Sequence, residues 1–348
     1  METKIVDANK ELLEFDAAAK CLKEGGLVAF PTETVYGLGG NALNPNSSKK
    51  IYEAKGRPSD NPLIVHICDI KTLDKICKEV CKEAYILAER FWPGPLTMVL
   101  NKSDIVPYET TGGLDTVAVR MPDNKVALAL IDKAGGFVAA PSANVSGKPS
   151  PTKAEHVYND MKGRIEYIVD GGEVGIGIES TIVDLTSKVP TILRPGYITK
   201  QMLEEVLETA RYDKAILEEN AGKDLVPKAP GMKYKHYAPN GELTIVSGNP
   251  ETVVDKINTL VENNIKCGYK TGVIATDETV QQYRCNNVIS LGTRKDKQTL
   301  SHNLYNALRE FDNMEVLYIY SEDFGEDEFG QAIMNRLLKA AGYKRIEV

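Results

Sequence analysis

Short apolar runs alternate with helix-forming segments along most of this 348-residue chain, and this alternation restricts the possible folds. Runs of four or five apolar residues bounded by turn residues are typical of buried strands, while apolar residues at every third or fourth position predict helices. The predicted strands of the first two thirds are 27–30, 63–67, 96–100, 117–120, 137–140, 165–169, 181–183 and 191–193. The predicted helices are 47–55, 72–90, 124–134, 153–161 and one near 198–210. The sequence therefore predicts an α/β domain built on a large, twisted mixed sheet.

A second, smaller α/β pattern begins near residue 243. Its predicted strands are 243–247, 272–276, 288–291 and 316–320, and its predicted helices lie near 250–264, 298–312 and 329–341. Such regular alternation predicts a parallel, Rossmann-like sheet. Residues 211–240 lack periodicity and are rich in turn residues and aromatics, so we interpret them as a linker or loop. The expected organisation is a first domain at 1–210, this linker at 211–240 and a C-terminal domain at 241–348.

Composition and charge argue against several classes of protein. The net charge of −7 leaves no global basic field for nonspecific nucleic-acid binding. No apolar stretch approaches the ~18 residues that span a bilayer, and the charged N-terminus has no signal-peptide core. The six cysteines lack CxxC spacing and, with four histidines, form no zinc pattern. We expect a cytoplasmic protein with no membrane association, no stable nucleic-acid complex and no metal held by protein side chains.

A glycine-rich stretch at 37–42 formally matches the GxGxxA pattern of dinucleotide-binding proteins. In such a site the helix begins within the glycines, so that its N-terminus meets the pyrophosphate. Here four further residues separate the match from the helix predicted to begin near Ser47. We therefore interpret the glycines as structural. A Walker A sequence is also absent from the chain.

Four polar blocks carry hydroxyl, amide or cationic side chains on turns, mostly beside predicted strands. They are Phe30–Gly39, Lys55–Pro58, Pro141–Asn144, and Glu179–Ile182 together with Arg194–Gly196. Polar groups on rigid turns at strand ends are typical of a polyanion site. No Ser or Cys nucleophile is paired with His and Asp, and HExxH is absent. The chemistry indicated is positioning and electrostatic stabilisation of a phosphoryl centre.

Each candidate residue also has a structural interpretation. Lys55 and Arg57 suit a triphosphate, but at a helix end they also suit solvated charges that compensate the helix dipole. Ser-x-Asn at 142–144 suits phosphate or ribose, and equally caps turns. Arg120 and Arg194 end predicted strands. One such arginine would form an internal salt bridge by default, but two beside the other motifs suggest carboxylate and phosphate clamps. His66 interrupts an apolar strand, where a satisfied core histidine is the default interpretation.

The same blocks, in the same order, resemble the YrdC/YwlC family of threonylcarbamoyl-AMP synthases in its two-domain form. Further stretches that carry the resemblance are Ile51–His66, Phe91–Thr97, Ala139–Thr152, Gly177–Ile182, Pro230–Tyr234 and Ala332–Arg336. The resemblance implies a YrdC-like first domain with a concave basic cavity. It implies that this domain condenses L-threonine, bicarbonate or CO2, and ATP with its Mg²⁺ into L-threonylcarbamoyladenylate and pyrophosphate. It further implies that a separate tRNA threonylcarbamoyl transferase uses the product to make N6-threonylcarbamoyladenosine.

The resemblance also implies which residues form the site. The threonine-binding residues would be Thr34, His66, Arg120, Ala140 and Ser180, with Arg120 clamping the carboxylate. The ATP-binding residues would be Lys55, Arg57, Asn61, Thr116, Ser142, Asn144, Ser150, Arg194 and Tyr234, with Tyr237 as the alternative linker tyrosine. Lys55 and Arg57 would be catalytic, since they would absorb charge as pyrophosphate leaves. The linker would close over the cavity.

Two other functions compete with this interpretation. One is a nonenzymatic RNA-binding module with a YrdC-like basic cavity, against which the acidic balance and the lack of Lys/Arg stripes count. The other is a carbamoyl-transfer maturation factor that contains a YrdC-like domain. Such factors carry zinc-finger CxxC pairs and an acylphosphatase-like region, and this chain has no CxxC.

Overall fold

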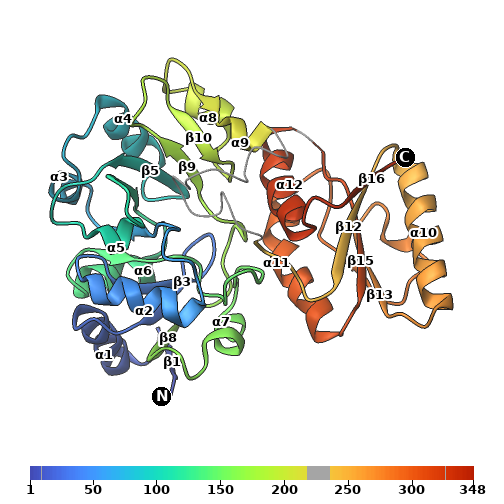
Figure 1. Cartoon of the computed structure of the whole chain (residues 1–348), viewed down its shortest axis with the longest axis horizontal. Helices are drawn as coiled ribbons and strands as arrows, with labels where there is room; N and C mark the ends of the chain where they lie inside the picture. Colours follow the sequence, from blue (N-terminus) through green and yellow to red (C-terminus); the bar gives the residue numbers. More distant parts are fainter. Residues whose placement is uncertain (9, 218–235, 326) are drawn as a thin grey trace. The chain divides into compact units, whose positions relative to one another are not determined.

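The computed structural model describes residues 1–8, 10–217, 236–325 and 327–348, and the chain divides into two compact units (Figure 1). The first contains Met1–Ser146, Ser150–Gly175 and the segment from Glu179 onward. The second contains Gly147–Pro149, Ile176–Ile178 and the segment that ends at Val348. The expected domain boundaries near 210 and 240 stay a prediction. No helix within the described ranges is long and apolar enough to cross a membrane.

The first unit is built on a mixed sheet, for which eleven strands are described, in the order β1-β8-β2-β3-β7-β4-β6-β5-β9-β10-β11. The strands are β1 (Lys4–Asp7), β2 (Val28–Phe30), β3 (Gly37–Asn41), β4 (Ile64–His66), β5 (Leu96–Asn101), β6 (Thr116–Arg120), β7 (Val138–Ala139), β8 (Tyr167–Asp170), β9 (Thr181–Asp184), β10 (Thr191–Arg194) and β11 (Arg211–Tyr212). The pairs β4–β6 and β5–β9 are parallel, while β5–β6 and β9–β10 are antiparallel. The predicted mixed sheet is confirmed.

The helices of this unit lie between the strands in the chain. They are α1 (Leu12–Lys23), α2 (Pro45–Lys55), the 3₁₀ helix η1 (Ile70–Thr72), α3 (Leu73–Ile76), α4 (Lys82–Phe91), α5 (Tyr108–Thr111), α6 (Lys125–Lys133), α7 (Ala154–Met161), α8 (Lys200–Glu204) and α9 (Lys214–Leu217). The first of them, α1, was not predicted, although it buries the apolar stripe Phe15, Ala18, Ala19 and Leu22.

The glycines at 37–42 belong to β3 rather than to a phosphate-binding loop. This strand pairs antiparallel with β2, and α2 begins only at Pro45 behind the N-cap Asn44. A Cβ on Gly39 would lie 2.9 Å from carbons of Phe30 and Val138, so glycine lets three strands pack closely there. The structural interpretation of this motif is confirmed.

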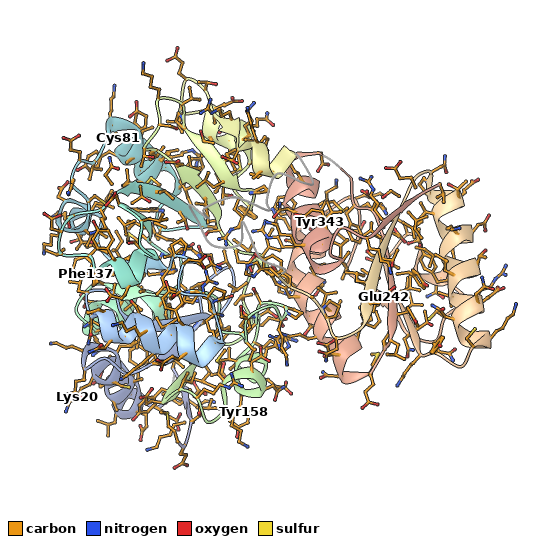
Figure 2. The ribbon with its side chains drawn as sticks, viewed as in Figure 1. Lys20, Cys81, Phe137, Tyr158, Glu242 and Tyr343 are labelled. Atoms are coloured by element: carbon orange, nitrogen blue, oxygen red, sulfur yellow. The ribbon has the colours of Figure 1, made fainter. Side chains whose placement is uncertain are left out.

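The single helix predicted over 72–90 is wrong. The chain leaves the helical conformation at Cys77, where Lys78 N donates to Asn101 O at 3.0 Å, and α4 begins after Cys81. Pairing with the end of β5 therefore replaces about one helical turn. Cys77 and Cys81 consequently do not share a helix, and Figure 2 marks Cys81 beside the start of α4.

The first part of the predicted linker is also structured, which corrects the sequence interpretation. Strand β11 pairs parallel with β10, and Asp213 N donates to Ile192 O at 2.9 Å before α9 begins. A two-residue strand followed by a single helical turn has too little periodicity to be recognised from sequence.

The second unit is an all-parallel α/β layer structure. Its described strands follow the order β14-β13-β15-β12-β16, and Figure 1 shows α10 on one face of the sheet and α11 and α12 on the other. The elements are β12 (Glu242–Ser247), α10 (Pro250–Lys266), β13 (Thr271–Ala275), the 3₁₀ helix η2 (Val280–Gln282), β14 (Val288–Ser290), α11 (Lys297–Asn313), β15 (Tyr318–Glu322), α12 (Glu328–Ala340) and β16 (Arg345–Glu347). The predicted Rossmann-like parallel sheet is confirmed.

The structure describes Tyr237 but not Tyr234, the other linker tyrosine. Tyr237 is buried in the second unit, with its ring 5.3 Å from that of Tyr305 on α11. Tyr234, the predicted ATP contact, lies outside the described residues, as does most of the segment predicted to close over the site.

Candidate active site

The central strands of the first unit have two different faces. One face lies in the main core and carries Val65, Val117, Val119 and Met98. Side chains alternate along a strand, so the neighbouring residues point to the opposite face. That face holds a separate small apolar cluster of Ile64, Val99, Ala118, Ile182 and Leu193. Toward β2 the same face is packed by α1 and α6 through Phe30, Val138 and Ala140.

Polar residues cross this face in a row between the two apolar parts. His66 on β4 and Thr97 on β5 are both register partners of Arg120 on β6. Side chains of directly paired residues lie on the same face, so the three are neighbours. Arg120 is only 4% exposed. Its Nε donates to Gly94 O at 3.3 Å and its Nη1 to Thr34 Oγ1 at 2.9 Å.

The turn between β2 and β3 holds Thr34 in place. Thr32 Oγ1 accepts from the backbone N–H groups of Thr34 at 3.1 Å and Val35 at 3.2 Å, and it donates to Val35 O at 2.6 Å. The hydroxyls of Thr32 and Thr34 are 2.9 Å apart. This local network presents Thr34 Oγ1 to Arg120 from a rigid turn.

Ser180 connects the row to Arg194. The hydroxyl of Ser180 lies 2.7 Å from Thr97 Oγ1 and accepts from Arg194 Nη2 at 3.2 Å, while Arg194 Nε donates to Ser180 O at 3.1 Å. Ala140 N donates to Ile64 O at 2.8 Å, which places Ala140 beside β4. The five predicted threonine-binding residues therefore gather around one part of one sheet face.

Lys55 fixes the turn that follows β7. It ends α2, is 1% exposed, and its Nζ donates to Ser142 O at 2.5 Å and Asn144 O at 2.6 Å. Within the turn, Ser142 Oγ donates to Asn144 Oδ1 at 2.5 Å. The main chain of the same turn contacts β3, because Leu38 N donates to Pro141 O. Lys55 thus joins α2 to the Ser-x-Asn turn, and the main chain of that turn is bonded to β3.

Arg57 is 9% exposed and holds a different segment. Its Nε donates to Asn61 O and its Nη2 to Pro62 O, each at 3.2 Å. Asn61 Oδ1 is buried and has no hydrogen-bond partner among the described residues. The alternative in which Lys55 and Arg57 are solvated charges at a helix end is wrong, because both are buried.

Comparisons with known proteins identify the family. Residues 20–196 match the Sua5/YciO/YrdC family, described as telomere recombination, and residues 198–342 match the threonylcarbamoyl-AMP synthase C-terminal domain. The threonylcarbamoyl-AMP synthase of Bacillus subtilis is 50% identical over 98% of this chain and 99% of its own length. That of Pyrococcus abyssi is 50% identical over 95% of both chains. The chain belongs to the Sua5/YrdC threonylcarbamoyl-AMP synthase family. Its resemblance to the two-domain form is confirmed.

A solved family structure matches across both units. The crystal structure of P. abyssi Sua5 complexed with L-threonine has a TM-score of 0.93 and 48% identity, and the match covers all of both chains. The family fold is therefore present over the full length of the chain.

Two further predicted site residues, Thr116 and Ser150, lie in the same unit but outside the polar row. Thr116 begins β6, four residues and therefore about 13 Å from Arg120 along the strand. Ala118 of the apolar cluster lies between them on the same face. Ser150 Oγ donates to Glu179 Oε1 at 2.5 Å, next to Ser180 in the chain. Thr116 and Ser150 thus flank the row rather than join it.

Sequence reasoning assigned no role to Glu33, Thr97 or Glu179. Glu33 and Glu179 stand inside the quoted blocks, and Thr97 ends the Phe91–Thr97 stretch of the family resemblance. An acid within a block of hydroxyl and cationic residues was a usable signal for the two glutamates. The contact of Thr97 with Arg120 depends on strand register, which the sequence does not contain.

Burial, together with the neighbouring Arg120 guanidinium, lowers the pKa of His66 to about 3. The ring is neutral at physiological pH, and its Nδ1 lies 3.1 Å from Ile64 O. A neutral, hydrogen-bonded histidine beside Arg120 is compatible with a core role and with a threonine-binding role for His66.

This pKa predicts a pH dependence of stability. Between about pH 6.5 and pH 3 the unfolded chain binds a proton at His66 that the folded chain excludes, so stability falls as pH falls through this window. The slope from this residue approaches about 1.4 kcal/mol per pH unit. Denaturant unfolding of wild type and His66→Gln at several pH values measures it. The difference between the two proteins should flatten above pH 6.5, and a difference independent of pH would contradict the assignment.

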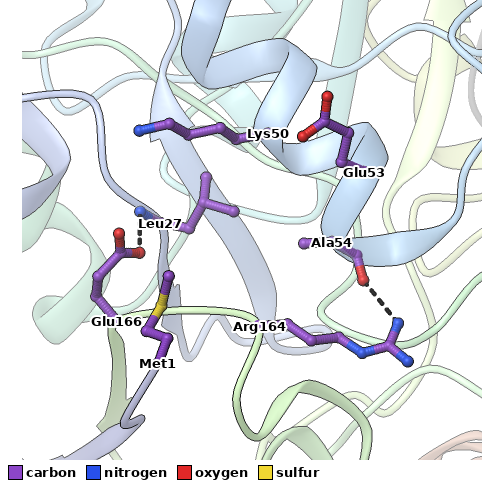
Figure 3. Close-up of a pocket in the computed structure, with 7 residues that line it drawn as sticks. All are labelled: Met1, Leu27, Lys50, Glu53, Ala54, Arg164 and Glu166. Atoms are coloured by element: carbon purple, nitrogen blue, oxygen red, sulfur yellow. Dashed lines mark hydrogen bonds between the residues drawn. The ribbon is translucent and has the colours of Figure 1, made fainter.

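Two cavities of about 460 and 480 Å³ lie elsewhere in the first unit. Figure 3 shows the first, where Arg164 donates to Ala54 O and Glu166 accepts from Leu27 N. Neither cavity is lined by a predicted site residue. Among the described residues, no group of three or more His, Cys, Asp or Glu suits a metal ion.

Proposed function

We propose that the polar row on the first unit's sheet performs the synthesis of L-threonylcarbamoyladenylate from L-threonine, bicarbonate or CO2, and ATP, releasing pyrophosphate. This reaction is the first step in the biosynthesis of N6-threonylcarbamoyladenosine in tRNA. The observation that carries the proposal is the buried guanidinium of Arg120, held beside Thr34, His66 and Ser180. P. abyssi Sua5, which is 48% identical, forms a complex with L-threonine, and this supports L-threonine as a ligand of this protein.

Arg120 is proposed to bind the carboxylate of L-threonine. A planar guanidinium fixed by Gly94 and Thr34 is preorganised for a carboxylate, so little entropy is lost on binding. Neutral His66 adds no competing charge, and Ser180 offers a hydroxyl to the substrate side chain. Ala140, whose side chain is only a methyl group, would border the substrate beside β4.

ATP is proposed to lie along the same sheet face. Lys55, Arg57, Asn61, Ser142, Asn144, Ser150 and Arg194 would bind its phosphates and ribose. Asn61 Oδ1, which has no hydrogen-bond partner in the described part of the chain, would accept from such a ligand. The buried apolar cluster of Ile64, Val99 and Ala118, between Arg120 and Thr116, would border a nucleobase or ribose. Tyr234 stays a predicted contact outside the described residues.

The chemistry follows from bringing these groups together. The threonine amine adds CO2 and loses a proton to give a carbamate, and a carbamate oxygen then forms a bond to the α-phosphorus of ATP. The bond from that phosphorus to the bridging oxygen breaks, and pyrophosphate leaves. Buried Lys55 and Arg57 would stabilise the charge that develops on it. Mg²⁺ would enter as part of the ATP substrate, held by phosphate oxygens.

The steps after synthesis are proposals that rest on family membership. The product would pass to a tRNA threonylcarbamoyl transferase, and a cytoplasmic location stays a prediction. Closure of the linker over the site would protect the carbamate, which is short-lived in water.

The proposed function is tested by pyrophosphate release. Purified protein with MgATP should release pyrophosphate only when both L-threonine and bicarbonate are present. Omitting either substrate, or replacing L-threonine with D-threonine, should reduce release to the background rate. Release that is independent of threonine would contradict the proposal and indicate a nucleotidase. Tight, salt-dependent binding of bare tRNA without any release would favour the RNA-binding alternative.

A further inference from the structure

We propose that Glu33 binds the ammonium group of L-threonine next to the carboxylate clamp formed by Arg120. The inference rests on the proposed function, because it takes L-threonine as the substrate. Glu33 stands in the turn between β2 and β3, one residue before Thr34. It is therefore anchored by the same hydroxyl network that positions Thr34.

Glu33 is an incompletely satisfied acid. Its side chain is 13% exposed, and its Oε2 lies 2.7 Å from Arg120 Nη2. The two groups form an ion pair, yet their alignment is not that of a hydrogen bond, and both carboxylate oxygens are buried without a donor among the described residues. Buried carboxylates normally accept several hydrogen bonds, because an unpaired acceptor costs stability. Among the residues that the structure describes, Glu33 thus has Arg120 as an ion-pair partner but no aligned hydrogen-bond donor.

An α-amino acid supplies the missing donor. Its carboxylate and ammonium are attached to one carbon, so its two charges are as close together as those of Arg120 and Glu33. A carboxylate on the arginine brings the ammonium toward the neighbouring acid. An ammonium group has three donors and no acceptor, and its hydrogen bonds to a carboxylate are charge-assisted.

The other groups around Arg120 are poorer acceptors for an ammonium group. Of the five residues predicted to bind threonine, none is an acid. Thr34 already accepts from Arg120, and Ser180 is bonded to Thr97 and Arg194. The other nearby acid, Glu179, accepts the hydroxyl of Ser150 at 2.5 Å. Glu33 is the carboxylate that contacts the clamp itself.

The test compares two ligands that differ only in the amine. Calorimetry would measure the binding of L-threonine and of the 3-hydroxybutanoate with the same side-chain configuration, which lacks the ammonium. Glu33→Gln keeps the size of the side chain and removes its charge. We expect this change to weaken L-threonine binding roughly 10-fold to 100-fold. Binding of the deaminated ligand should be unchanged or tighter, because a competing carboxylate near Arg120 is gone.

Two further variants complete the design. Glu33→Asp retains the charge and should retain a preference for L-threonine over the deaminated ligand. Glu166→Gln removes a carboxylate that accepts from Leu27 N in the cavity of Figure 3, and it should alter neither affinity. If Glu33→Gln does not fold, the preference retained by Glu33→Asp and lost in Glu33→Ser provides the same comparison.

The outcomes separate this inference from the function on which it rests. A selective loss of L-threonine binding supports an ammonium contact. An equal loss for both ligands, or no loss, overturns it and leaves Glu33 as a structural counterion of Arg120. In those cases wild-type protein still binds L-threonine and the proposed function stands. Failure of wild type to bind L-threonine at all would overturn both.

Discussion

Replacing Arg120 with methionine is expected to abolish L-threonine binding and leave ATP binding essentially unchanged. Methionine fills a similar volume but offers no donor to the substrate carboxylate. Loss of a two-point, charge-assisted contact corresponds to at least about 3 kcal/mol, or a 100-fold fall in affinity. Calorimetric titrations with L-threonine and with ATP measure both effects on one protein sample.

The same substitution should also destabilise the protein, because Glu33 loses its ion-pair partner. Removing one member of a buried pair typically costs about 3–5 kcal/mol. The double variant Arg120→Met, Glu33→Gln should recover much of this stability without recovering threonine binding. Arg164→Met is the matched control, since Arg164 donates to Ala54 O away from the site. Wild-type affinity for L-threonine in the Arg120→Met protein would place the carboxylate clamp elsewhere.

Replacing Lys55 with methionine is expected to reduce both ATP affinity and stability. The ammonium group donates to the carbonyls of Ser142 and Asn144, and methionine leaves both carbonyls without this donor. Hydrogen bonds from a charged group contribute about 1.5–3 kcal/mol each, so the free energy of unfolding should fall by about 3 kcal/mol. The Ser-x-Asn turn would also lose its anchor, so ATP should bind more weakly than the loss of one phosphate contact alone would produce.

The control lies on the same helix. Lys50 is exposed and donates from Nζ to Gly25 O at 2.8 Å, so Lys50→Met removes a similar bond outside the site. It should change stability by less than about 1 kcal/mol and leave ATP affinity intact. Thermal unfolding and ATP titration of both variants measure the contribution of Lys55 to stability and to ATP affinity. Unchanged ATP affinity in Lys55→Met would remove this lysine from the nucleotide site.

The sequence could predict most of the strands because each is a compact apolar run ended by turn residues. It could also place Arg120 and Arg194 at strand ends, since both follow such runs. The pairing of His66, Arg120 and Thr97 could not be predicted, because β4, β6 and β5 become neighbours only through the order and register of the sheet. The ion pair of Glu33 with Arg120 is non-local for the same reason.

The errors have local physical causes. Apolar spacing continues through Cys77 to Cys81, but main-chain pairing with β5 is stronger there than the helical tendency, and the predicted helix divides. Residues 211–217 are too short for a periodic signal, yet the edge of the sheet at β10 gives Arg211 and Tyr212 a partner strand. Lys55 has the sequence features of a solvated helix end. Only the fold shows that carbonyls from residues 142 and 144 surround its ammonium group.

The protein is expected to join carbon dioxide, threonine and adenylate in one product. The most direct test incubates the protein with MgATP, L-threonine and bicarbonate labelled with carbon-13, followed by mass spectrometry of the nucleotides. We predict a threonylcarbamoyl adenylate that carries the heavy carbon, and its absence when the Arg120→Met protein is used. A threonine-containing adenylate without the label, or ADP and phosphate as the products, would contradict the proposed reaction.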